Sequence, residues 1–89
     1  MKTRKGFHLR SICGEHIIVA EGIENIDFSR IISMNESSAF LWSKIEGQSF
    51  TEDDLVNYLT EEYEVAETTA RHDVQELIKE WIKSGIIEE

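Results

Sequence analysis

The side chains that could do chemistry in this sequence are few and scattered. The single cysteine, Cys13, and His16 have a Cys-x-x-His spacing, which is half of a zinc site. Structural zinc usually takes four ligands, and no second pair follows. We therefore expect no metal site, with Cys13 as a small buried strand residue and His16 at the surface or an edge. A small metal or redox protein using this pair stays open as a third hypothesis.

Carboxylates gather in two places, residues 52–54 and residues 61–67. The first group begins a predicted helix, where negative charge interacts favourably with the free N–H groups. The second is typical of a solvated surface. Catalysis needs a nucleophile beside a base, or two carboxylates in different environments, within a pocket. The sequence shows neither, and its five glycines form no phosphate-binding loop, so we expect no enzyme and no cofactor.

The first third of the chain has the alternation of β-strands. Along residues 7–12, Phe7, Leu9 and Ser11 alternate with His8, Arg10 and Ile12, as side chains on the two faces of a strand do. Gly14 offers a tight turn, and residues 16–20 are rich in β-branched side chains, so the segment predicts a hairpin. Residues 21–30 mix turn formers with isolated apolar residues and are expected to form a loop. A short third strand at residues 30–34 is expected to be a sheet edge with unpaired backbone groups.

Three helices are predicted after the strands. Asn35 is a good N-cap for the first, which Gly47 ends. The second begins at Thr51 with a capping-box pattern that has Asp54 in place of Glu or Gln. The third runs from about residue 67 to 84, with Gly85 at its end. Its apolar stripe is wide enough to leave one flank for a partner; the stripe comprises Ala70, Val74, Leu77, Ile78, Trp81 and Ile82.

Strands followed by helices predict an α+β fold, resembling a winged helix-turn-helix, with a three-stranded antiparallel sheet and three helices. At 89 residues the chain is expected to be a single domain, residues 1–89, with strands at about 7–34 and helices at about 36–84. The two tryptophans, Trp42 and Trp81, are expected to anchor its core, and a share of Trp81 in a binding groove stays open.

The net charge of −9 is unevenly distributed. Residues 51–89 contain twelve acidic and three basic side chains, whereas residues 1–50 are neutral. Phosphate neutralisation normally dominates DNA binding, so this distribution argues against nucleic acid as a partner. The sequence has neither a signal-peptide pattern nor an apolar run near 18 residues, so we expect a cytoplasmic protein without membrane contact.

Three stretches together resemble the PQQ synthesis protein D family. They are residues 9–19, residues 31–42, and residues 73–78 with 85–87. The most specific combination is an Asn-Glu-x-x-Ala-x-x-Trp helix start at Asn35, followed later by Asp73-Val74. The similarity covers nearly the whole chain in order and length. One departure is Met34, where the family commonly has Leu, and a swap of similar volume should preserve the core.

The resemblance implies a peptide chaperone, a recognition element for ribosomally made and post-translationally modified peptides. Members bind the leader of a precursor peptide and present its core to a modifying enzyme, often a radical SAM protein. In the family the leader adds as a strand beside the third strand and lies against the third helix. Carried over, this implies peptide contacts at Arg30, Ile31, Ile32, Ser33, Met34, Arg71, Val74, Gln75 and Ile78. Arg30 and Arg71 could pair with acidic leader residues or be ordinary surface charges.

Other hypotheses stay open at this point. The order of strands and helices also suits an acidic winged-helix transcriptional regulator that binds DNA or a protein partner. The oligomeric state, monomer or homodimer, is open because an exposed strand edge can pair with a copy of itself. The resemblance does not identify the precursor peptide, the modifying enzyme, the final product or the flank of the third helix that faces the peptide.

Overall fold

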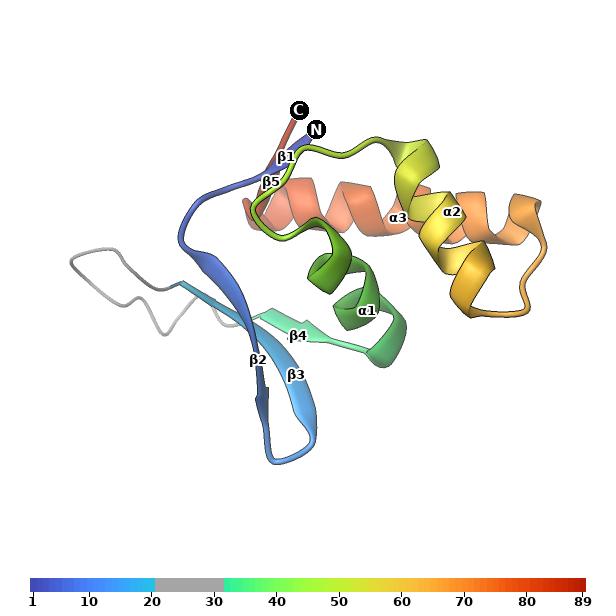
Figure 1. Cartoon of the computed structure of the whole chain (residues 1–89). Helices are drawn as coiled ribbons and strands as arrows, with labels where there is room; N and C mark the ends of the chain where they lie inside the picture. Colours follow the sequence, from blue (N-terminus) through green and yellow to red (C-terminus); the bar gives the residue numbers. More distant parts are fainter. Residues whose placement is uncertain (21–31) are drawn as a thin grey trace.

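The computed structural model describes residues 1–20 and 32–89. Within these ranges a sheet packs against three helices, as Figure 1 shows. The elements in chain order are β1 (Lys2–Thr3), β2 (Phe7–Ile12), β3 (Glu15–Ala20), β4 (Ile32–Met34), α1 (Glu36–Ile45), α2 (Glu52–Glu62), α3 (Glu67–Ser84) and β5 (Ile87–Glu88). The predicted α+β fold, with a three-stranded antiparallel sheet followed by three helices, is confirmed.

The main sheet has the strand order β2-β3-β4, with both neighbouring pairs antiparallel. A two-residue turn joins β2 to β3, and both of its residues have positive φ, 53° at Cys13 and 80° at Gly14. Such turns match the right-handed twist of the strands they join. The expectation that Cys13 is a buried strand residue was wrong, because the turn places its side chain at the exposed tip of the hairpin.

The third predicted strand is present as β4, which the structure describes from Ile32 to Met34. The loop expected at residues 21–30, and the strand positions Arg30 and Ile31, lie outside the described residues. Ile32 pairs with Ile18 and Met34 with His16 on β3. The side chain of Met34 is buried, so the residue that stands in place of the common Leu contributes to the core.

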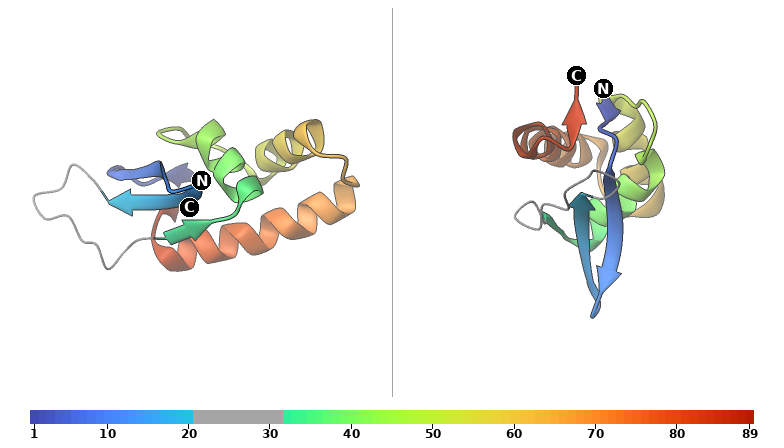
Figure 2. Two further views of the ribbon diagram at one scale, coloured as in Figure 1. Left: turned by 90° about the horizontal axis from the view of Figure 1, so that it is seen from below. Right: turned by 90° about the vertical axis from the view of Figure 1, so that its left-hand side faces the viewer.

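A second, two-stranded sheet was not predicted. It pairs β1 with β5 and brings the two ends of the chain side by side, as the two views in Figure 2 show. The buried Thr3 hydroxyl accepts a hydrogen bond of 2.8 Å from Gly47 N–H, and Arg4 N–H donates one of 2.9 Å to Ile86 O. Two residues are too few to show a strand period, so these strands could not be predicted from periodicity.

The helix starts follow the predicted caps. Asn35 accepts a 2.8 Å hydrogen bond from Ser38 N–H at the start of α1. At α2 Thr51 and Asp54 form a reciprocal capping box, with bonds of 3.0 and 3.1 Å. The shorter Asp54 therefore replaces Glu or Gln without loss of the motif. Gly85 ends α3 with a φ of 81°, a conformation that costs glycine little.

The core lies where α1, α2 and α3 meet the inner face of the main sheet. Trp42 of α1 and Trp81 of α3 are 0% and 3% exposed, and their rings meet edge to face with centroids 5.4 Å apart. Such pairs add about 0.5–1.5 kcal/mol to the gain from burial. The prediction that both tryptophans anchor the core is confirmed. None of the helices in the described ranges combines the length and apolar character that crossing a lipid bilayer demands.

Candidate peptide-binding site

The two outer edges of the main sheet are not equivalent, and the difference begins with the hydrogen-bond pattern. The two-residue turn makes Ile12 and Glu15 a hydrogen-bonded pair, so alternate residues along β3 bond first to β2 and then to β4. His16 and Ile18 therefore bond to Met34 and Ile32 of β4. Ser33 lies between these two residues, and its backbone N–H and C=O point away from β3.

Among the residues that the structure describes, no other strand pairs with β4. Ser33 is exposed, and neither its backbone nor its side chain has a hydrogen-bond partner beyond the sheet in the described part of the chain. An outward N–H and C=O on an edge strand can accept a further strand. As far as residues 1–20 and 32–89 are concerned, the β4 edge is therefore open to strand addition.

The opposite edge, β2, is closed by side chains. Leu9 of β2 has the outward orientation that Ser33 has in β4. Its N–H donates a 2.9 Å hydrogen bond to Glu46 Oε1, and its carbonyl accepts one of 3.1 Å from the side chain of Arg10. Both backbone groups at the middle of the β2 edge are thus occupied. A peptide strand that approaches β2 would have to displace these two hydrogen bonds, whereas no described residue occupies the outward backbone groups of Ser33 on β4.

Glu46 holds this closed edge through several donors. The same Oε1 accepts a 3.1 Å bond from the Trp42 indole N–H, and Oε2 lies 3.8 Å from His8 Nδ1. Burial by itself would raise the pKa of Glu46. The hydrogen bonds from Leu9 N–H and Trp42, together with the nearby His8, outweigh burial and lower the pKa below its ordinary value of 4.5. The carboxylate is therefore charged at neutral pH.

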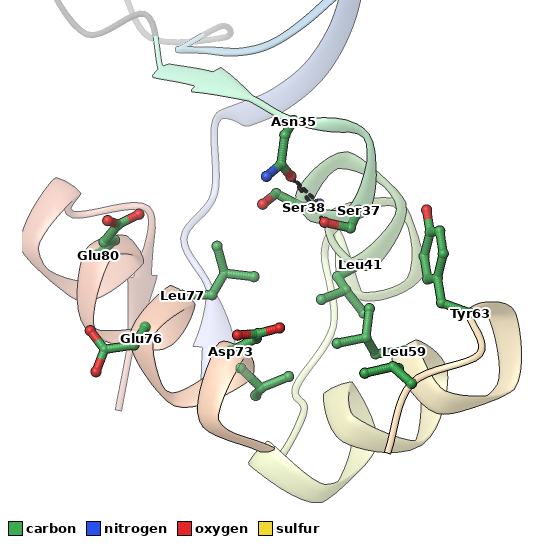
Figure 3. Close-up of a pocket in the computed structure, with 12 residues that line it drawn as sticks. Asn35, Ser37, Ser38, Leu41, Leu59, Tyr63, Asp73, Glu76, Leu77 and Glu80 are labelled. Atoms are coloured by element: carbon green, nitrogen blue, oxygen red, sulfur yellow. Dashed lines mark hydrogen bonds between the residues drawn. The ribbon is translucent and has the colours of Figure 1, made fainter. Parts of the chain in front are cut away.

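A groove of about 520 Å³ opens between α1, the end of α2 and α3, within the size range of small ligand pockets. Figure 3 shows its side chains. Its apolar walls come from Leu41, Leu59, Tyr63, Val65, Val74 and Leu77. Its polar lining comes from Asn35, Ser37, Ser38, Asp73, Glu76 and Glu80.

The groove begins where β4 ends. Asn35 directly follows β4 and lines the groove, and Figure 3 shows it at one end, above Leu41 and Leu77. In Figures 1 and 2 β4 and α3 run nearly side by side in opposite directions. A strand that pairs with β4 and continues past Met34 would therefore pass over the groove and along α3. Asn35 thus connects the end of β4 with the groove.

The structure places the predicted contacts on α3 in three different surroundings. Val74 is fully buried and lies at the base of the groove. Ile78 is buried in the core and is 8% exposed. Arg71 and Gln75 line a separate hollow near the start of α3, on another face of the helix. The groove thus meets α3 mainly along the line of Asp73, Leu77 and Glu80.

Arg71 is held by carboxylates of the protein itself. Its guanidinium lies 2.7 Å from Glu52, 2.9 Å from Asp53 and 3.4 Å from Glu67. Hydrogen bonds to Glu52, then Asp53 and Glu67, raise the pKa of the guanidinium above its ordinary value. The arrangement ties the first turn of α2 to the first turn of α3. Any acidic residue of a peptide would have to compete with these three partners.

Three groove residues, Asp73, Leu77 and Glu80, were not predicted as contacts. Leu77 belonged to the apolar stripe of the predicted helix, where its half-buried position could not be separated from those of its neighbours. Asp73 entered only as part of the family motif, and Glu80 only among the twelve acidic side chains of residues 51–89. The sequence predicts the apolar face of a helix, but the packing of α1 and α2 decides which side of that face stays open.

The predicted pair of Cys13 and His16 lies at the tip of the hairpin. His16 Nδ1 is 3.0 Å from the Ser11 hydroxyl, so one ring nitrogen is engaged by a neighbouring side chain. In the described ranges no three His, Cys, Asp or Glu side chains come together as metal ligands would. Neither the groove nor the β4 edge includes Cys13.

An antiparallel sheet with one open edge, followed by three helices that frame a groove, is a small α+β domain equipped for strand addition. The family model of coenzyme PQQ synthesis protein D (PqqD) matches residues 15–87, and the chain belongs to this family. The resemblance found in the sequence is confirmed. Among solved structures, TbiB1 in complex with the TbiA(beta) leader peptide has a similar fold, with a TM-score of 0.74. The two sequences are 16% identical, and the alignment covers 99% of this chain and 95% of TbiB1. A comparison with curated proteins finds no significant match.

Proposed function

We propose that this chain is a peptide chaperone that binds the leader of a ribosomally made precursor peptide by strand addition and presents the precursor to a modifying enzyme. The observation that carries the proposal is the open edge at Ser33 of β4, which continues into the groove beside α3. Backbone hydrogen bonds along such an edge supply affinity, while pockets for alternate side chains supply specificity. Family membership and the leader-bound TbiB1 fold support the same function.

The contacts on the peptide side are part of the proposal. The proposed strand contacts are Arg30, Ile31, Ile32, Ser33 and Met34. Ser33 would supply the outward backbone N–H and C=O of β4, because Ile32 and Met34 bond to β3. Val74 would contribute to the base of the groove. Arg71, Gln75 and Ile78 are kept as proposed contacts from the family resemblance, although they do not line the groove itself.

The chain is proposed to have no catalytic activity of its own. The chemistry would belong to the modifying enzyme, for which a radical SAM protein is the proposed partner because such enzymes often act with members of this family. The precursor is a ribosomal product, which supports the cytoplasm as the place of action. Affinity capture from the native host, followed by mass spectrometry, should recover a short precursor and its modifying enzyme together. Recovery of neither would contradict the proposed partners.

The edge itself is tested by substitution at Ser33. Ser33→Pro removes the outward N–H, and proline is tolerated in strands chiefly at edges. We expect leader affinity to fall about tenfold, through the lost hydrogen bond and the bulk of the ring. Ser33→Ala is the matched control, because it keeps the backbone N–H and should bind like the wild type. The probe is a synthetic leader peptide of the precursor recovered by affinity capture, titrated into ¹⁵N-labelled protein.

Amide shifts in the titration locate the peptide. Changes centred on residues 32–35 and on α3 support the site. Shifts confined to regions remote from β4 and α3, or equal affinity of the Pro and Ala variants with the fold intact, would contradict it.

A further inference from the structure

The groove beside α3 has a charge that restricts the peptides it can accept. Among the residues that the structure describes, its lining contains three carboxylates, those of Asp73, Glu76 and Glu80, and no basic side chain. Glu76 lies 3.5 Å from Lys79, and Figure 3 shows its carboxylate turned away from the centre. Asp73 and Glu80 have no ion pair or side-chain hydrogen bond with any residue in the described part of the chain. Two carboxylates that have no ion-pair partner among residues 1–20 and 32–89 therefore border the groove.

The two free carboxylates flank an apolar position. Asp73, Leu77 and Glu80 are spaced i, i+4 and i+7, so they form one line along α3. At 1.5 Å per residue, about 10 Å of helix separates Asp73 from Glu80. In an extended peptide, residues i and i+4 lie on one face about 13 Å apart, with i+2 between them. Lysine and arginine side chains are long and flexible enough to cover the difference between the helix spacing and the peptide spacing.

We infer that the leader segment bound by this chain is cationic, with the pattern basic-x-apolar-x-basic over the groove. The inference rests on the proposed function and specifies its ligand. The apolar residue would contact Leu41, Val74 and Leu77, and the basic residues would pair with Asp73 and Glu80. An acidic segment at this position would meet two like charges in a partly enclosed site, together with a chain whose net charge is −9.

The length of the recognised segment follows from the same geometry. β4 offers three residues for pairing, and the basic-x-apolar-x-basic pattern over the groove takes about five more extended residues. The minimal segment is therefore about eight residues long. Its cationic part lies over α3, and its strand part lies beside β4.

The test uses a phage-displayed library of random ten-residue peptides, selected against the full chain. The same selection is made with Asp73→Asn/Glu80→Gln and with the control Glu61→Gln/Glu64→Gln, which changes the net charge equally at exposed residues outside the groove. The wild type and the control should both enrich peptides with the basic-x-apolar-x-basic pattern. The groove variant should lose that enrichment. A peptide selected on the wild type should bind the groove variant about tenfold more weakly, as expected for two partly exposed ion pairs.

The outcomes separate this inference from the proposed function. Selected peptides that shift the amides of Ser33 and Leu77 without basic enrichment, or that bind the groove variant equally well, would overturn the cationic pattern and leave leader binding intact. Failure to enrich any peptide, or enrichment of peptides that shift only amides remote from β4 and α3, would overturn both.

Discussion

At the scale of single residues, Glu46 has the most specific structural task. One carboxylate oxygen accepts hydrogen bonds from Leu9 N–H of β2 and from the Trp42 indole of α1. It thereby closes the β2 edge and fixes the end of α1 against the sheet. Ser33 is the counterpart on β4, with its backbone groups left outward. The choice of edge for a peptide thus depends on one side chain that is present at β2 and has no equivalent beside Ser33 in the described residues.

Glu46→Ala should lower the free energy of unfolding by about 1–2 kcal/mol at pH 7, because two donors lose their acceptor. The folded-state pKa of Glu46 lies below its ordinary value of 4.5. The stabilisation is therefore fully present above that value and is lost as the pH falls through the folded-state pKa. Urea unfolding at pH 7 and pH 3 should show the difference between wild type and variant shrinking at pH 3.

Glu61→Ala serves as the control, because Glu61 is an exposed carboxylate remote from β2 and should change stability little at either pH. A difference between wild type and Glu46→Ala that is as large at pH 3 as at pH 7 would show that the charged carboxylate is not what closes the edge.

At the scale of elements, the start of α3 and its middle have different partners. Arg71 ties the first turn of α3 to the start of α2 through three carboxylates. Further along, Asp73, Leu77 and Glu80 face the groove. The periodicity of the sequence predicted the length and the apolar stripe of this helix correctly, because both depend on local spacing. The open flank depends on how α1 and α2 cover the stripe, and that contact is long-range.

Arg71→Gln should lower the urea midpoint of unfolding, because it releases α2 from α3. It should change leader affinity only slightly, because Glu52, Asp53 and Glu67 already engage the guanidinium. The control is Lys79→Gln, an equal change of charge at an exposed residue of α3 with one weak contact. It should alter neither property by much. Leader affinity is measured by titration under native conditions for both variants. A clear loss of affinity in Arg71→Gln, with its fold intact, would place the leader against the other flank of α3.

At the scale of the whole molecule, much of the fold was predictable from the sequence. Alternation in the hairpin, the caps at Asn35 and Thr51, and Gly85 at the end of α3 are local signals, and each element appears where it was expected. The β1–β5 pair was missed because its strands are held by contacts between the two ends of the chain. Cys13 was misplaced because the turn conformation outweighed the apolar character of the side chain.

The candidate site was predictable only in part. The short third strand indicated an edge, but a sequence does not show which of two edges is occupied, because the Leu9–Glu46 bond joins residues 37 positions apart. The acidic half of the chain argued against DNA, and the structure adds that three of those acids, Asp73, Glu76 and Glu80, line the groove. These acidic side chains are the basis for proposing a cationic peptide partner.

Hydrogen exchange at the Ser33 amide, with and without saturating leader peptide, tests the central claim most directly. In the free protein this outward N–H should exchange rapidly, while the amides of Ile32 and Met34 are protected by β3. Bound leader should protect Ser33 and leave the Leu9 amide unchanged. A Ser33 amide that exchanges equally fast in the saturated complex, or new protection at β2 instead, would contradict strand addition at β4.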